Sequence, residues 1–196
     1  MGMEEYFIED PDELFSDFVS TGVLAIDLAT SPHRGPGGIP LGKITEIFGA
    51  EDSGKTTLCM SIIAQAQKEE LDITYFDPEN SYNPFFAELM GVDNYDVDFS
   101  SLEEGERVID TIEALAINDV TDVIILDSIP GLSSESILKT EMGDQSVAPD
   151  ARMWSKAYKK LKSALNRSNT ALVMINQLRD DVGNSYGRGI TTPGGE

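Results

Sequence analysis

The sequence predicts an α/β fold whose core is a mainly parallel β-sheet flanked by helices. Three short runs are largely apolar, which is typical of parallel strands covered on both faces; they are 73–77, 123–128 and 171–177, and a further β-rich run lies at 44–48. Between them lie segments with helical periodicity, at 58–67, 101–118 and 151–167. Strands that alternate with helices favour a parallel sheet with helices on both sides.

A phosphate-binding sequence joins the first strand to the first helix and is the most specific motif in the chain. Residues 49–57 fit the pattern G-x-x-x-x-G-K-[ST], with a strand before and a helix after, as the motif requires. The predicted nucleotide-binding residues are Gly49, Ala50, Glu51, Asp52, Ser53, Gly54, Lys55, Thr56 and Thr57. Backbone amides of such a loop form an anion cradle. We expect Lys55 to reach the β- and γ-phosphates of ATP and Thr56 to bind Mg²⁺.

Polar residues follow the ends of the other three strands. In open parallel sheets, ligands sit beyond the carboxyl ends of the strands, so these residues should converge on the phosphate loop. Asp127 ends an apolar strand and is predicted to hold Mg²⁺ beside Thr56. An acid at a strand end is common, so this assignment depends on the loop.

Hydrolysis of ATP needs a group that activates or positions the attacking water. Glu79 follows its strand by two residues and is the preferred candidate, with Asp77 as its rival and a turn cap as the alternative role for Asp77. Gln177 ends the last strand, where its amide can bind a γ-phosphate oxygen and distinguish ATP from ADP. A simple strand-end cap is the alternative for Gln177.

Composition limits the classes of function that remain. The 196 residues are 40% hydrophobic and carry a net charge of −21, which argues against a general nucleic-acid binder. No apolar run is long enough to span a bilayer, and Cys59 is the only cysteine, so an internal disulfide is impossible. One domain with a substantial core, in a reducing cytoplasm, fits these numbers.

One segment departs from the acidic average. Six of the 14 Lys+Arg lie between residues 152 and 167, with no acid among them; they are Arg152, Lys156, Lys159, Lys160, Lys162 and Arg167. On a helix, Arg152, Lys156 and Lys159 share a face through their spacing of three and four. We expect this face to contact DNA phosphates, with a solvated basic surface as the alternative.

Taken together, these stretches resemble the ATPase core of the RecA recombinase family, bacterial and phage members above all. The matching stretches run in family order over nearly the whole chain from Ser20; they are 20–22, 37–42, 49–57, 76–79, 123–128, 142–144, 151–153, 168–170, 175–179 and 191–195. The resemblance implies a P-loop NTPase of RecA type, working in the cytoplasm of a bacterium or a phage-infected host.

The resemblance also implies roles for individual residues. Glu79 matches the acid that activates water, Gln177 the nucleotide-sensing glutamine, and Phe86 the ring that stacks on adenine. Residues 141–149 and 179–195 match the two DNA-binding loops, in which Val147 and Val182 match apolar wedges between base triplets and Arg179 is a further expected DNA contact. The expected activity is DNA-dependent ATP hydrolysis, with pairing of single-stranded DNA to a homologous duplex by a filament.

Three features differ from the family pattern. Residues 1–19 form only a short acidic arm before the core at 20–196, either packed as a strap or docked on a neighbour. Asp180 and Asp181 beside Arg179 should weaken its phosphate contact. The chain ends at Glu196, where the family continues, so we expect a C-terminally incomplete core, from a split gene or a truncation. The alternatives are a related hexameric helicase or clock-type ATPase, and a nucleotide-binding fragment without turnover.

Overall fold

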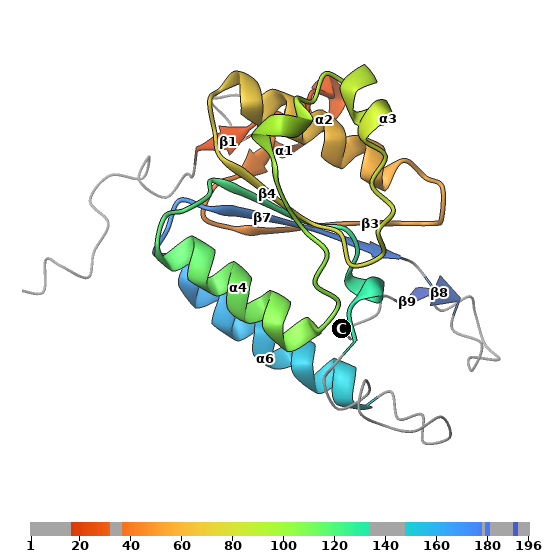
Figure 1. Cartoon of the computed structure of the whole chain (residues 1–196), viewed down its shortest axis with the longest axis vertical. Coiled ribbons are helices and arrows are strands. Elements are labelled where there is room, and N and C mark those ends of the chain that lie inside the picture. Colours follow the sequence, from red (N-terminus) through yellow and green to blue (C-terminus); the bar gives the residue numbers. More distant parts are fainter. Residues whose placement is uncertain (1–16, 32–36, 134–147, 178, 181–189, 192–196) are drawn as a thin grey trace, which may run out of the picture.

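A five-stranded, fully parallel sheet lies at the centre of the molecule (Figure 1). The structure, a computed structural model, describes residues 17–31, 37–133, 148–177, 179–180 and 190–191. The strand order is β3-β7-β6-β4-β5. The strands are β3 (Ile44–Gly49), β4 (Ile73–Phe76), β5 (Asp98–Ser100), β6 (Val123–Leu126) and β7 (Ala171–Gln177). The predicted α/β fold with a mainly parallel sheet is confirmed.

Parallel pairing fixes which strand ends lie side by side. β3 and β7 pair from Ile44 opposite Leu172 to Gly49 opposite Gln177. Leu126, the last residue of β6, lies opposite Phe76 of β4. The segments that follow these strands therefore leave the sheet at the same edge.

Five α-helices among the described residues cover the two faces of the sheet (Figure 1). They are α1 (Leu24–Thr30), α2 (Lys55–Lys68), α3 (Pro84–Leu89), α4 (Gly105–Ile117) and α6 (Ala148–Leu165), with the short 3-10 turns η3 (Asn94–Asp96) and η4 (Ile129–Gly131). α3 starts with Pro84 in its first turn, and the Asn83 side chain accepts a hydrogen bond from the Phe86 amide at 3.1 Å. This is the usual chemistry of a helix N-terminus.

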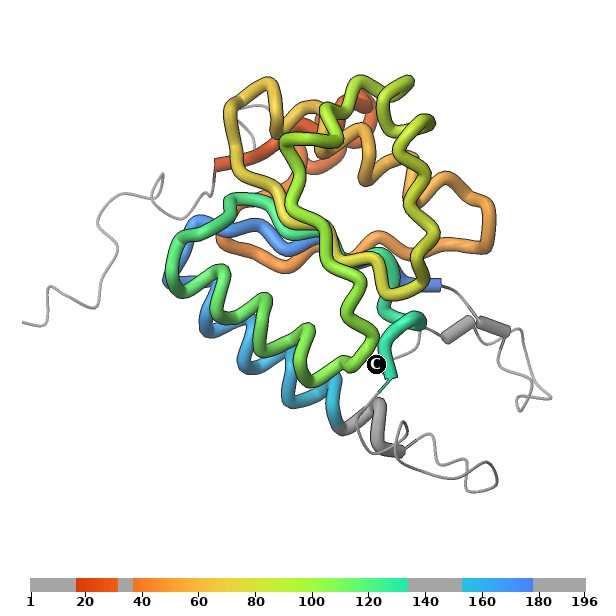
Figure 2. Tube along the Cα trace, viewed as in Figure 1, coloured from red at the N-terminus to blue at the C-terminus, as the bar shows by residue number. Residues whose placement is uncertain are grey.

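Alternation along each strand divides the core into two clusters. Val123 and Ile125 of β6 pack with α2, whereas Ile124 and Leu126 pack with α4 and α6. Successive side chains of a strand point to opposite faces, so a continuous apolar run supplies both layers. Figure 2 shows α4 and α6 running side by side below the sheet.

The structure also contains short elements that the sequence did not predict. Two-residue strands form two antiparallel pairs; they are β1 (Phe18–Val19) with β2 (Ile39–Pro40), and β8 (Arg179–Asp180) with β9 (Ile190–Thr191). In the second pair, Arg179 lies opposite Thr191 and Asp180 opposite Ile190. The helix predicted at 101–118 begins only at Gly105, because β5 and a bridge from Glu104 to Ser133 precede it.

No helix among the described residues is long and apolar enough to cross a membrane. The predicted N-terminal arm, residues 1–19, lies outside the described residues except for Asp17, Phe18 and Val19. Of the two expected DNA-binding loops, 141–149 is described only at its last two residues and 179–195 only at β8 and β9.

The packing of α6 against the sheet can be tested by truncating one side chain. Leu161 is 1% exposed within the cluster that α4, α6 and the sheet form. Leu161→Ala should lower the free energy of unfolding by about 2–5 kcal/mol, the usual cost of deleting a buried leucine side chain. Exposed Lys162→Ala on the same helix should change it by less than about 0.5 kcal/mol. Urea unfolding of both variants checks this, and equal effects would contradict the packing.

Candidate nucleotide-binding site

A polar cavity of about 410 Å³ lies at the carboxyl edge of the sheet. Residues from the phosphate loop and from the ends of β4, β6 and β7 line it together. The lining residues are Glu51, Asp52, Ser53, Gly54, Lys55, Thr56, Thr57, Glu79, Ser81, Asp127, Ser128, Ile175 and Gln177. The structure thus brings together the loop, Glu79, Asp127 and Gln177, which are separated in the sequence.

The conformation of the loop favours glycine at two positions. A Cβ atom on Gly49 would lie 2.7 Å from Ser53 Oγ, so the Ser53 side chain would have to rotate away. Gly54 has φ +89°, a left-handed conformation that residues with a Cβ rarely adopt. Lys55, the first residue of α2, donates to the carbonyl oxygens of Ala50 at 2.7 Å and Gly49 at 3.3 Å. The ammonium group therefore lies over the concave side of the loop.

Asp127 is the centre of a hydrogen-bonded group beneath the loop. Its Oδ2 accepts from Thr56 Oγ1 at 2.7 Å and from Tyr75 Oη at 2.8 Å. Asp127 is 5% exposed, and this burial raises the pKa of its carboxyl group, although the two hydrogen bonds partly oppose the shift. Burial, with the negative field of Asp127, also raises the pKa of Tyr75, so that Tyr75 stays a neutral donor.

Glu79 and Asp77 occupy different environments. The Glu79 carboxylate accepts a hydrogen bond from Ser128 Oγ at 2.6 Å and lines the cavity. Asp77 is buried and accepts from the backbone N–H groups of Ser81 at 3.0 Å and Tyr82 at 2.9 Å. Both Asp77 oxygens thus hold the turn after β4, whereas Glu79 faces the cavity.

Gln177 lies beside the loop because β7 pairs with β3. Gly49, the first residue of the motif, is its partner in the parallel register. The alternation of β7 places Gln177 on the same face as Val173 and Ile175, which pack with α2. Its side chain therefore leaves the strand on the face that carries the phosphate loop.

Other predicted residues lie away from the cavity or outside the described part of the chain. Phe86 is 38% exposed on α3 and does not line the cavity. Val147 and Val182 lie outside the described residues, and for Arg152 and Arg179 only the backbone is described.

The basic helix divides into exposed and paired lysines. Lys156 and Lys159 are exposed on α6. Lys160 donates to Asp110 at 2.6 Å and contacts Glu113 at 2.7 Å on α4, and these hydrogen bonds raise the pKa of its ammonium group. Lys160 therefore helps to join α4 to α6, while Lys156 and Lys159 face solvent.

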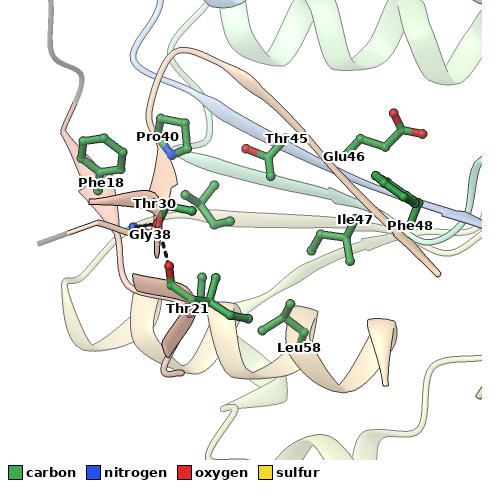
Figure 3. A pocket seen from close by; sticks show the side chains of 12 residues that line it. Phe18, Thr21, Thr30, Gly38, Pro40, Thr45, Glu46, Ile47, Phe48 and Leu58 are labelled. Atoms are coloured by element: carbon green, nitrogen blue, oxygen red, sulfur yellow. Dashed lines mark hydrogen bonds between the residues drawn. The ribbon is translucent and has the colours of Figure 1, made fainter. Parts of the chain in front are cut away.

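A second, larger cavity of about 560 Å³ lies between the edge strand β3 and α2 (Figure 3). Its lining is mostly apolar, from side chains such as Phe18, Ile47 and Leu58. Among the described residues that line it, Glu46 is the only one with a charged side chain, and its carboxylate points to the other side of β3 (Figure 3). The described residues that line this cavity offer no cationic group or amide cradle for phosphates, whereas the smaller polar cavity offers both, so the polar cavity is the candidate site.

The donor set of the polar cavity fits a nucleoside triphosphate and a divalent metal. Mg²⁺ is usually held by one or two protein oxygens together with phosphate oxygens and water. Thr56 and Asp127 supply such oxygens next to the loop. Within the described part of the chain, no cluster of three or more His, Cys, Asp or Glu side chains forms that could hold a metal ion.

Tyr75 is the site residue that sequence reasoning missed. It lies inside an apolar strand and is 0% exposed, so its ring looks like ordinary core. No local signal marks this role, because the acid that it contacts lies on another strand, 52 residues away. Its hydroxyl fixes the carboxylate that is predicted to hold the metal.

Because Asp127 carries a buried charge, removing that charge should raise the melting temperature by an amount that depends on pH. Asp127→Asn keeps an oxygen that can accept from Thr56 and Tyr75, but it removes the buried charge, so the nucleotide-free variant should melt at a higher temperature. The folded chain favours protonated Asp127, so wild-type stability falls as pH rises through the raised pKa. The gain should therefore be largest near neutral pH and shrink toward about pH 4, where carboxyl groups ordinarily protonate.

Calorimetric melting across this pH range tests the prediction, with exposed Asp96→Asn as the control. A gain that does not depend on pH, or one that the control shares, would contradict it.

Comparison with known proteins agrees with this geometry. Residues 8–196 match the family model of the RecA N-terminal domain. Protein RecA of Thermus aquaticus is 45% identical over 179 residues, covering 91% of this chain and 52% of that protein. Protein RecA of Aquifex aeolicus (strain VF5) is 44% identical over 177 residues, covering 90% and 50%. The chain spans about half the length of the curated relatives it matches. This chain belongs to the RecA family.

Proposed function

We propose that the chain is the ATPase core of a DNA recombinase, which binds single-stranded DNA and promotes homologous pairing and strand exchange in recombination and repair. The observation that carries the proposal is the single cavity in which the phosphate loop, Asp127, Glu79 and Gln177 meet. Membership of the RecA family supports the same activity.

In this proposal each of these residues of the cavity has its own role in binding or hydrolysing MgATP. The loop amides and Lys55 bind the phosphates, and Thr56 and Asp127 hold Mg²⁺, which neutralises charge that develops on the phosphate oxygens. Glu79 orients the attacking water and accepts its proton. The hydrogen bond from Ser128 supports this role, since it holds the carboxylate at the cavity wall.

Gln177 is the proposed link between nucleotide and DNA. Its amide binds the γ-phosphate, which is present in ATP and absent in ADP, and the second loop follows directly in the chain. The exposed Lys156 and Lys159 of α6 contact DNA phosphates, together with Arg152 and Arg179. Phe86 stacks on adenine, and Val147 and Val182 contact bases. Filament formation on single-stranded DNA and pairing with a homologous duplex complete the proposal.

Nucleotide binding should depend on one ammonium group. Lys55→Ala should abolish measurable binding of MgATP, because charge-assisted hydrogen bonds to phosphate are the strongest contacts of the site. Lys68→Ala, which removes the same charge from the other end of α2, should leave binding unchanged. Isothermal titration calorimetry on both variants is the measurement, and equal affinities for Lys55→Ala and wild type would overturn the assignment.

Hydrolysis should depend on Glu79 rather than Asp77. Glu79→Gln should leave ATP binding nearly intact and slow phosphate release by roughly 10²–10⁴, the usual worth of a positioned base. A coupled phosphate-release assay with and without single-stranded DNA measures the rate. If Asp77→Asn gives this pattern and Glu79→Gln does not, the wrong carboxylate has been assigned. Wild type that binds ATP without any turnover would favour the nucleotide-binding fragment.

DNA binding should depend on ATP and on the exposed lysines of α6. Lys156→Ala combined with Lys159→Ala should flatten the log–log salt slope by about 1.4, from about 0.7 per phosphate contact on single strands. The pair Lys160→Ala and Lys162→Ala removes the same charge from the same helix and should flatten it less. Fluorescence anisotropy on oligonucleotides, with a non-hydrolysable ATP analogue, measures both slopes. Equal flattening by the two pairs would show a general charge effect.

A further inference from the structure

A buried amide links the outer strand of the sheet to the backbone of Gln177. Asn176 Nδ2 donates to Glu46 Oε1 of β3 at 2.7 Å. Asn176 Oδ1 accepts from the backbone N–H of Gln177 at 2.9 Å. The two ends of one side-chain amide therefore hold two different strands at the carboxyl edge of the sheet.

These residues lie on the face opposite the nucleotide cavity. Leu172 and Met174 of β7 pack with α4 and α6, and alternation places Asn176 on the same face. Ile44 of β3 joins that cluster too, so Glu46 also points there. Figure 3 shows the Glu46 carboxylate on the other side of β3 from Ile47 and Leu58. Gln177, the next residue along β7, points back toward the phosphate loop.

Burial makes the orientation of the Asn176 amide unambiguous. Asn176 is 1% exposed, and a buried amide must satisfy its donors and acceptor locally. A carboxylate can only accept, so the Asn176 nitrogen faces Glu46 and its oxygen faces the Gln177 N–H. Burial raises the pKa of Tyr158 on α6 to about 12, and the negative charge of nearby Glu46 adds to this shift. Tyr158 is therefore neutral and adds no competing charge.

We propose that Asn176, held by Glu46, is a positioning residue for Gln177: it fixes the end of β7, and thereby the direction in which the Gln177 side chain leaves the strand toward the γ-phosphate. A free end of β7 would let Gln177 sample several directions, and binding would then cost the entropy of ordering it. This inference rests on the proposed role of Gln177 as the group that distinguishes ATP from ADP.

A polarity swap tests the pair without changing its size. Asn176→Asp places two carboxylates together and removes the donor, so the pair should separate. Adding Glu46→Gln supplies an amide donor from the other side and should restore the hydrogen bond with reversed polarity. Glu46→Gln alone keeps an acceptor oxygen for Asn176 and should have little effect. If Asn176→Asp acted only by destabilising the fold, and not through its contact with Glu46, adding Glu46→Gln would not reverse its effect.

The first readout needs no nucleotide. Hydrogen exchange of the Gln177 backbone amide, followed by NMR, should be about tenfold less protected in Asn176→Asp, because repulsion from Glu46 turns the new carboxylate away from the Gln177 N–H and the loss of one hydrogen bond is worth up to about that factor. Protection should return in the swapped pair. Unchanged protection in Asn176→Asp, or no recovery in the swapped pair, would overturn the inference.

The second readout is the ratio of dissociation constants for ADP and a non-hydrolysable ATP analogue, both with Mg²⁺. Asn176→Asp should lower this ratio toward the value of Gln177→Ala while leaving the ADP constant unchanged, and the swapped pair should recover it. A Gln177→Ala variant that discriminates like wild type would reject the proposed sensor, while amide protection still decides the positioning role. Discrimination lost in Gln177→Ala but kept in Asn176→Asp would reject the positioning role alone.

Discussion

The parallel register of β3, β7, β6 and β4 is the constraint on which the rest of the structure depends. It aligns Gly49 with Gln177 and Leu126 with Phe76, so that the polar residues after these strands surround one cavity. Side chains alternate between faces, so a slip of one residue in β7 would turn Gln177 away from the phosphate loop. Apolar side chains on both faces of each strand oppose such a slip, because it would exchange the two core clusters.

The sheet also separates nucleotide chemistry from the basic helix. α2 and the phosphate loop lie on one face, and α4 and α6 lie on the other. A net charge of −21 repels nucleic acid over most of the surface, so exposed lysines gathered on α6 give any contact a defined place. β7 is central to both sides, because Gln177 points to the loop and Asn176 to the face of α6. In the proposed function, a change at the phosphates would reach the segment that follows through the carboxyl end of β7.

Much of the fold and of the candidate site could be predicted from the sequence where the physical signal is local. Continuous apolar runs located β6 and β7, and the strand-end rule gathered Glu79, Asp127 and Gln177 at one edge. What the sequence could not show depends on distant partners. Tyr75 has the pattern of a core aromatic until its hydroxyl meets Asp127, 52 residues away. Glu46 and Asn176 are 130 residues apart, and only strand pairing joins them. Residues 23–28 are apolar at five of six positions, so no alternation of apolar and polar residues marked α1 as a helix.

The central claim is that the polar strand ends form one MgATP site around the phosphate loop. A crystal structure of the chain with Mg²⁺ and a non-hydrolysable ATP analogue tests it most directly. The account predicts phosphates over the 49–54 loop, the metal beside Thr56 and Asp127, and the γ-phosphate between Glu79 and Gln177. Nucleotide bound in the apolar cavity along β3, or a metal held away from Thr56 and Asp127, would contradict it.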